Sequence, residues 1–150
     1  MSKSTFTIGV FAAILDEKNR ILFCHRTDHD LWNLPGGALE YSETPWDCAI
    51  RETKEETGLD IKVKRLAGVY SKPDKNEVVF QFICEIVGGK ITLNKEADKI
   101  EYFAFNDIPK NTPPKQVERI KDVLVGKGET LVMKIQEGPS SIDLIKSGRL

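Results

Sequence analysis

Three glutamates in one short stretch of the chain could bind a metal ion. Glu52, Glu55 and Glu56 are spaced i, i+3 and i+4, so on a helix they share one face. Carboxylates crowded in this way repel one another, which is unfavourable for stability unless a cation lies among them. Because hard oxygen ligands suit Mg²⁺ or Mn²⁺, the spacing predicts a site for one of these divalent ions.

The residues around the glutamates predict the helix that must carry them. Thr44 fits an N-cap, Pro45 fits the first turn, and Gly58 fits a C-terminal cap. The opposite face of this helix should pack on the core. Its predicted apolar stripe consists of Trp46, Ala49, Ile50, Thr53 and Thr57.

A glycine pair, Gly36 and Gly37, precedes the helix. Glycine lets the backbone approach an ion closely, and a backbone carbonyl there can serve as a ligand. The same pair could instead form a turn with positive φ, and both interpretations are compatible.

Together these residues follow the Nudix box, and the chain resembles the Nudix hydrolases, also called MutT-like proteins. The residues that match are Gly37, Glu43, Arg51, Glu52, Glu55, Glu56, Gly58 and Leu59. One position departs from the pattern, because Thr53 stands where the box has an apolar residue. The threonine methyl group can still pack on the core, so we expect no loss of chemistry.

The resemblance implies a fold and a reaction. The fold is α+β, with a mixed β-sheet sandwiched between α-helices, and we expect residues 1–150 to form a single domain. The reaction is hydrolysis of a nucleoside diphosphate linked to a group X, in which water attacks phosphorus. Such a reaction requires in-line positioning and neutralisation of oxygen charge, which Mg²⁺ or Mn²⁺ supplies.

The resemblance also implies roles for the residues of the box. Glu55 and Glu56 are the first choices as metal ligands, and Glu52 is a ligand, a base that orients water, or both. Arg51 is expected to orient Glu43 or Glu52, although charge balance in an acidic patch would also explain it. The carbonyl of Gly36 is the expected backbone ligand.

Two further candidates lie outside the box. Many family members use an additional carboxylate before a late strand, and Glu96 is the best candidate here, with Asp98 and Glu101 behind it. Arg26 follows a predicted strand. In related proteins an arginine at this place contacts a substrate phosphate, and a guanidinium suits that role. Either side chain could instead be merely solvated. His25 and His29 lack metal-ligand spacing and receive no role.

Composition excludes several classes of protein. The net charge of −1 gives no general attraction to nucleic acid or to anionic membrane. The longest N-terminal apolar stretch, residues 8–15, is too short to span a membrane. Three cysteines without a Cys-x-x-Cys pair fit a reducing cytoplasm better than a disulfide or zinc scaffold.

The substrate remains open at this level. ADP-ribose, dinucleoside polyphosphates, nucleotide sugars and nucleoside triphosphates are all candidates. Segment 68–74 resembles the one in ADP-ribose pyrophosphatase-like members, which gives a weak preference for ADP-ribose. A basic cluster (Lys110, Lys115, Arg119, Lys121) leaves an RNA 5′ end as an alternative substrate. A nucleotide-sensing module without turnover is the third alternative, and a homodimer is not excluded.

The remaining pattern predicts the order of elements. Strands are expected at 6–15 and 20–25, joined as a hairpin, and then at 61–70, 77–87, 90–93, 100–105 and 130–135. A second helix is expected after Thr112, with Val117, Ile120, Val123 and Leu124 as its apolar stripe. The tail 138–150 gives weak signals.

Overall fold

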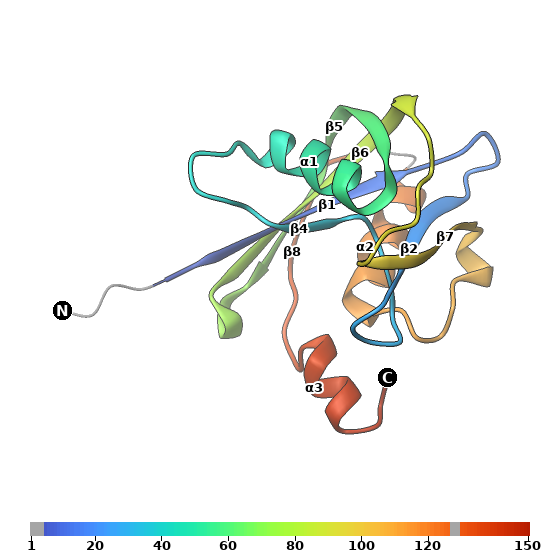
Figure 1. Cartoon of the computed structure of the whole chain (residues 1–150). Helices are drawn as coiled ribbons and strands as arrows, with labels where there is room; N and C mark the ends of the chain where they lie inside the picture. The colour runs from blue at the N-terminus through green and yellow to red at the C-terminus, as the bar shows by residue number, and fades with distance from the viewer. Residues whose placement is uncertain (1–4, 127–129) are drawn as a thin grey trace.

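The strands form two sheets (Figure 1). The computed structural model describes residues 5–126 and 130–150. The larger sheet has the order β4-β1-β6-β5-β8 and the smaller one β3-β2-β7. The larger sheet contains β1 (Thr7–Ile14), β4 (Gly36–Ala38), β5 (Leu59–Lys72), β6 (Glu77–Gly89) and β8 (Val132–Ile135). The smaller sheet contains β2 (Ile21–Arg26), β3 (Trp32–Asn33) and β7 (Ala97–Phe103).

The larger sheet is mixed, as predicted. β1 runs parallel to β6 and antiparallel to β4, while β5 runs antiparallel to β6 and parallel to β8. Three α-helices accompany the sheets: α1 (Pro45–Thr57), α2 (Pro114–Val125) and α3 (Ser141–Lys146). Two short 3₁₀ helices, η1 (Pro73–Lys75) and η2 (Phe105–Asp107), lie in connections.

Alternate side chains of β1 face the two long helices. Val10 and Ala12 are buried in an apolar cluster with Cys48 and Ala49 of α1. Phe11, between them in sequence, packs on a second cluster that contains Ile120 of α2. Because successive strand residues point to opposite faces, α1 and α2 cover opposite sides of the strands, as Figure 1 also shows. The predicted α+β sandwich is therefore confirmed.

The predicted hairpin at 6–25 is wrong beyond its turn. Asp16 closes that turn by accepting hydrogen bonds from the backbone N–H groups of Lys18 and Arg20, each at 2.9 Å. Past the turn, an isolated bridge joins Leu15 to Ile21. The two strands then separate into different sheets, because β1 pairs with β6 along its whole length and β2 pairs with β7.

Helix α1 has the predicted bounds. The Thr44 side chain accepts a hydrogen bond of 3.1 Å from the Asp47 N–H, and Gly58 ends the helix with a φ of 79°. Two members of the predicted core stripe are wrong, since Trp46 and Ile50 are 53% and 37% exposed. The buried face instead includes Cys48 together with Ala49, Thr53 and Thr57.

Residues 90–93 do not form the predicted strand. Thr92 N–H donates to Thr57 O at 2.8 Å, and the Asn94 side chain donates to Glu56 O at 2.8 Å. These bonds attach the segment to the end of α1, where it satisfies helix carbonyls. β7 consequently starts at Ala97, three residues before the predicted 100.

The elements of the second half of the chain agree in outline with the predicted ones. β5, β6, β8 and α2 occur near their predicted places. On α2, Ile120 and Val123 are buried as predicted, whereas Val117 and Leu124 are only partly buried, and Gln116 and Arg119 complete the buried face. The tail forms α3, which the sequence did not predict. Across the described ranges 5–126 and 130–150, the helices are all too short or too polar to cross a bilayer.

Candidate active site

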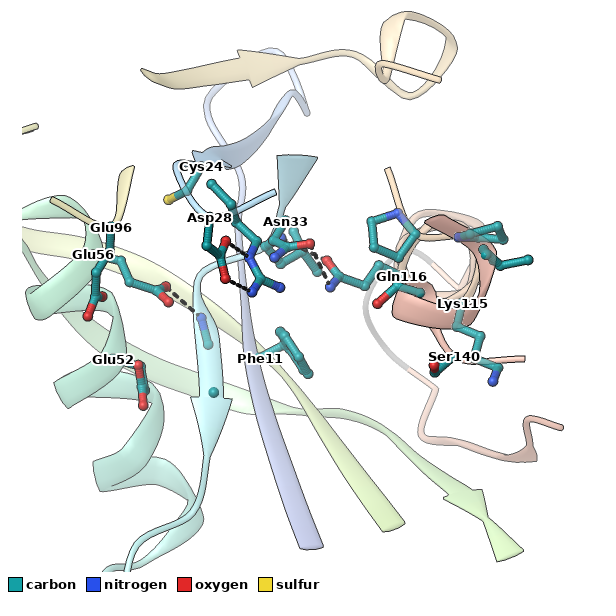
Figure 2. A pocket seen from close by; sticks show the side chains of 18 of the residues that line it. Phe11, Cys24, Asp28, Asn33, Glu52, Glu56, Glu96, Lys115, Gln116 and Ser140 are labelled. Atoms are coloured by element: carbon teal, nitrogen blue, oxygen red, sulfur yellow. Dashed lines mark hydrogen bonds and ion pairs between the residues drawn. The ribbon is translucent and has the colours of Figure 1, made fainter. Parts of the chain in front are cut away.

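A cavity of about 990 Å³ lies between α1, the two sheets and the C-terminal segment. Glu52 and Glu56 of α1 line one end, together with Glu96 from the loop before β7. Figure 2 shows these three carboxylates at one end and Lys115 and Ser140 at the other. The structure therefore brings together residues from three separate parts of the sequence.

Glu56 is the most buried of the predicted metal ligands. Its Oε2 accepts a hydrogen bond of 2.9 Å from the Gly36 N–H (Figure 2). Burial raises the pKa of Glu56 to about 8, and the nearby carboxylates of Glu52, Glu96 and Glu55 act in the same direction. Within the described part of the chain, Glu56 forms no ion pair with a basic side chain.

Glu52 lies directly against the glycine pair. A Cβ atom on Gly37 would be 2.6 Å from Glu52 Oε1, so glycine is needed for the carboxylate to take this position. Burial raises the pKa of Glu52, while the Arg51 charge opposes that shift. At Gly36 a Cβ atom would lie 2.2 Å from the Val10 carbonyl oxygen, so that position requires glycine because of the neighbouring backbone.

Arg51 binds carboxylates both inside and outside the cavity. Its Nε and Nη2 donate to the two carboxylate oxygens of Glu43 at 2.6 and 3.0 Å. The guanidinium hydrogen bonds lower the pKa of Glu43 to about 2. Nη1 donates to Glu52 at 3.1 Å and to Glu55 at 3.3 Å. Glu55 is half exposed and does not line the cavity, unlike Glu52 and Glu56.

The loop that carries Glu96 is fixed at several points. Asn94 Oδ1 accepts from the Glu96 N–H at 2.8 Å, and Glu96 O accepts from the Thr27 N–H at 3.2 Å. The reserve candidate Asp98 is engaged elsewhere, because its Oδ1 lies 2.6 Å from His25 Nδ1. The other ring nitrogen of His25 lies 2.8 Å from Asp30 Oδ1, so His25 of β2 links β7 to the loop between β2 and β3.

Arg26 lines the cavity, but its charge is already paired. Its Nε donates to Asp28 Oδ1 at 2.7 Å, and its Nη2 donates to the other carboxylate oxygen. These bonds raise the pKa of Arg26 and lower that of Asp28. The sequence placed Arg26 near the site but gave no sign of this partner.

The middle of the cavity contains residues that the sequence analysis did not select as site residues. Gln116 Oε1 accepts from the Leu34 N–H at 2.8 Å, which joins α2 to the loop before the glycine pair. Asn33 and Phe11 line the cavity beside it. The available signal was that Gln116 stands four residues before Ile120, on the predicted apolar face of the helix, but the sequence does not show which strand or loop that face meets.

The carboxylates do not form a closed metal cage. Among residues 5–126 and 130–150, no group of three or more acidic, histidine or cysteine side chains converges closely enough to enclose an ion. Mg²⁺ commonly uses only one or two protein carboxylates and completes its shell with water and substrate phosphate. An open arrangement of this kind is compatible with that mode of binding.

Comparisons with known proteins agree with the geometry. The NUDIX domain model matches residues 5–124. An ADP-ribose pyrophosphatase of Methanocaldococcus jannaschii is 38% identical over 104 residues, which are 65% of this chain and 62% of that protein. A MutT-like protein of Streptomyces ambofaciens is 31% identical over 122 residues, covering 81% of this chain and 79% of that protein.

A solved structure supports the same assignment. The crystal structure of an ADP-ribose pyrophosphatase from Streptococcus suis has a TM-score of 0.72 and 27% identity, and the match covers 88% of this chain and 100% of that chain. The family match includes the whole of α1 and the strands that position it. The chain therefore belongs to the Nudix hydrolases and is a pyrophosphohydrolase of that family.

Proposed function

We propose that this protein hydrolyses the pyrophosphate linkage of a nucleoside diphosphate joined to a second group, with ADP-ribose as the leading substrate. Two similar proteins bear the name ADP-ribose pyrophosphatase, although the match spans 62% of the length of one of them. The resemblance of segment 68–74 to ADP-ribose pyrophosphatase-like members gives a weak preference for the same substrate.

One observation carries the proposal: a single elongated cavity joins an acidic end to a mixed apolar and amide-lined region. Glu52, Glu56 and Glu96 lie at the acidic end, and Phe11 and Gln116 line the region beyond. A volume of about 990 Å³ suits a ligand of dinucleotide or nucleotide-sugar size. A diphosphate at the acidic end would leave room for the nucleoside further along.

The donor set at the acidic end fits Mg²⁺ or Mn²⁺. Glu56 is a partly buried carboxylate without a basic partner in the described part of the chain, and Glu52 and Glu96 add charge of the same sign. We assign Glu52, Glu56, Glu96 and the Gly36 carbonyl as the groups that hold the ion, with Glu55 as a peripheral ligand. When bound, the cation neutralises charge on the diphosphate oxygens.

The other residues position these groups. Arg51 holds Glu43 and Glu52 in one hydrogen-bonded unit, which fixes the orientation of Glu52. Glu52 and Glu56 are the two carboxylates placed to accept a proton from water near the cavity. Arg26 binds a phosphate oxygen by exchanging its Asp28 partner for the substrate.

We further propose that residues 1–150 act as one catalytic domain in the cytoplasm. All three cysteines are buried and unpaired, as expected for a protein that does not depend on disulfides.

A turnover screen tests the function. Purified protein would be incubated separately with Mg²⁺ and Mn²⁺ and with ADP-ribose, dinucleoside polyphosphates, nucleotide sugars, nucleoside triphosphates or 5′-triphosphorylated RNA, and products identified by chromatography. Glu56→Gln would run beside it, with Glu17→Gln as the matched control. Glu17 is exposed in the turn after β1 and lies outside the cavity.

Metal-dependent release of AMP from ADP-ribose, lost in Glu56→Gln and retained in Glu17→Gln, is the expected result. Hydrolysis of RNA ends alone would replace the proposed substrate class. Tight binding without turnover of any compound would favour a nucleotide sensor.

A further inference from the structure

The far end of the cavity is built by the C-terminal segment. Glu137, Pro139, Ser140, Ser141 and Leu144 all line it. These residues lie beyond position 124, where the match to the family model ends. The C-terminal wall, residues 136–144, therefore lies outside the matched domain, and the signals in its sequence are weak.

The segment is attached to the body by specific bonds, with Gln136 at the centre. Gln136 is buried, its N–H donates to Ser71 O at 2.8 Å, and its side-chain oxygen accepts from Arg119 Nη1 at 3.0 Å. Its side-chain amide donates to Lys115 O at 3.1 Å. The Gln136 side chain does not itself line the cavity.

Lys115 adds a second attachment. Its ammonium group donates to the carbonyl oxygens of Gly138 and Pro139 at 3.1 and 3.2 Å. The segment then turns into α3, which starts with a capping box formed by Ser140 and Asp143. Leu144 follows one turn later and is partly buried at the cavity. These contacts give the wall a defined position.

The chemistry of the far end favours an uncharged group. Three carboxylates and two ammonium groups line it: Glu77, Glu118, Glu137, Lys72 and Lys115. Lys72 is paired with Glu77 at 3.1 Å, and Lys115 is engaged by the backbone. A phosphate would meet an excess of negative charge there. Surfaces from Pro113, Pro139 and Leu144 line the same cavity as the Gln116 amide, and this combination suits a heterocyclic base.

We propose that the C-terminal wall, residues 136–144, is a specificity element that contacts the nucleoside half of the substrate. The inference rests on the proposed function, because the diphosphate must lie at the acidic end for the nucleoside to reach this wall. The wall then limits the length of the group that fits beyond the diphosphate, and Leu144 is its specificity-determining side chain.

A bulky substitution at Leu144 tests the proposal. Leu144→Trp would fill the far end, and Lys146→Trp would place the same side chain on the exposed side of the same helix as a control. KM and kcat would be measured with ADP-ribose and Mg²⁺. Binding of AMP, UMP, GMP and CMP would be measured by calorimetry, which requires no turnover. Thermal unfolding would verify that both variants are folded.

The expected result is a KM at least about tenfold higher in Leu144→Trp, with kcat within about twofold of wild type and a comparable loss of nucleotide affinity. Lys146→Trp should match wild type. Equal KM and equal nucleotide affinity in the two variants would overturn the proposed specificity role of the wall. The proposed hydrolase function would be unaffected by that result. The wild type could bind a nucleotide without turning over ADP-ribose, and Leu144→Trp could lose that binding. This result would support the role of the wall in nucleoside binding and reject the proposed function. A wild type that neither turns over ADP-ribose nor binds any of the four nucleotides would reject both.

Discussion

The carboxylate of Glu56 accepts a 2.9 Å hydrogen bond from the backbone N–H of Gly36, twenty residues earlier in the chain. This bond joins the cavity-facing side of α1 to the edge strand β4. It is a favourable contact for the ionised form, yet burial and neighbouring carboxylates outweigh it and raise the pKa of Glu56 to about 8. The consequence can be measured in the absence of metal.

Glu56→Gln should stabilise the metal-free protein at alkaline pH. The unfolded carboxyl has a pKa of about 4.3, so between that value and about 8 the folded state holds a proton that the unfolded state has released. Stability therefore falls as pH rises through this window. In EDTA, the Tm of wild type should fall between pH 6 and 9 by at least about 3 °C more than that of the variant.

Mg²⁺ supplies the matching control. At pH 8.5 it should raise the Tm of wild type and have little effect on Glu56→Gln. Parallel pH curves for the two proteins in EDTA would contradict the environment assigned to Glu56.

The two glycines of β4 should respond differently to alanine. In Gly37→Ala the new methyl group meets the flexible end of Glu52 at 2.6 Å, so we expect a folded protein with kcat/KM lowered by at least about tenfold. In Gly36→Ala it meets the Val10 carbonyl oxygen at 2.2 Å. Because backbone cannot move as easily, that variant should lose stability as well as activity.

Circular dichroism melting together with initial rates would separate the two effects. Similar Tm losses in both variants would show that Gly37 serves packing and has no specific relation to Glu52.

Arg51→Lys should reduce activity although the charge is kept. Lysine cannot reproduce the two parallel bonds to Glu43 or bond Glu52 at the same time. We expect kcat/KM to fall by about 10- to 100-fold, as for other groups that orient metal ligands. Arg20→Lys, which alters the 2.7 Å pair with Asp16 in the turn between β1 and β2, is the control.

Arg51→Lys should also change the stability of the protein at acid pH. Glu43 has a pKa of about 2 in the folded protein, below its unfolded value of about 4.3. The stabilisation that ionised Glu43 contributes is present above about pH 4.3 and is lost as pH falls toward 2. Arg51→Lys should therefore flatten the decline of Tm between pH 5 and 3, and an unchanged acid limb would contradict this account.

Asp28→Asn should improve binding of an anionic substrate. The substitution removes the carboxylate that neutralises Arg26 in the cavity. KM for ADP-ribose should fall by about two- to fivefold, which is the scale of a partly exposed ion pair, and Arg26→Ala should raise it. A rise in KM for both variants would mean that Asp28 positions Arg26 for the substrate.

The sequence was sufficient to predict structure where the signals are local. Thr44, Pro45 and Gly58 determine the ends of α1 through contacts within a few residues, and the spacing of Glu52 and Glu56 already places them on one face. The sequence was insufficient where the partner is distant. The exposure of Trp46 depends on what covers the start of α1, which periodicity does not reveal.

The division of the strands into two sheets is a second distant effect. A short turn between apolar runs usually indicates a hairpin, but the turn after β1 is followed by separate pairing partners for each strand. The pairing of Arg26 with Asp28 and the position of the C-terminal wall also depend on tertiary contacts. The roles of the predicted ligands remain predictions for the experiments above.

This division has a mechanical consequence. Glu52 and Glu56 belong to α1, which packs on β1 of the larger sheet, whereas Arg26 belongs to β2 of the smaller sheet. A ligand that touches both groups would act as a brace between two separately hydrogen-bonded sheets. Force or heat that separates the two sheets of the liganded protein would then have to break the contacts of the ligand. Loss of the ligand would remove this connection between the sheets.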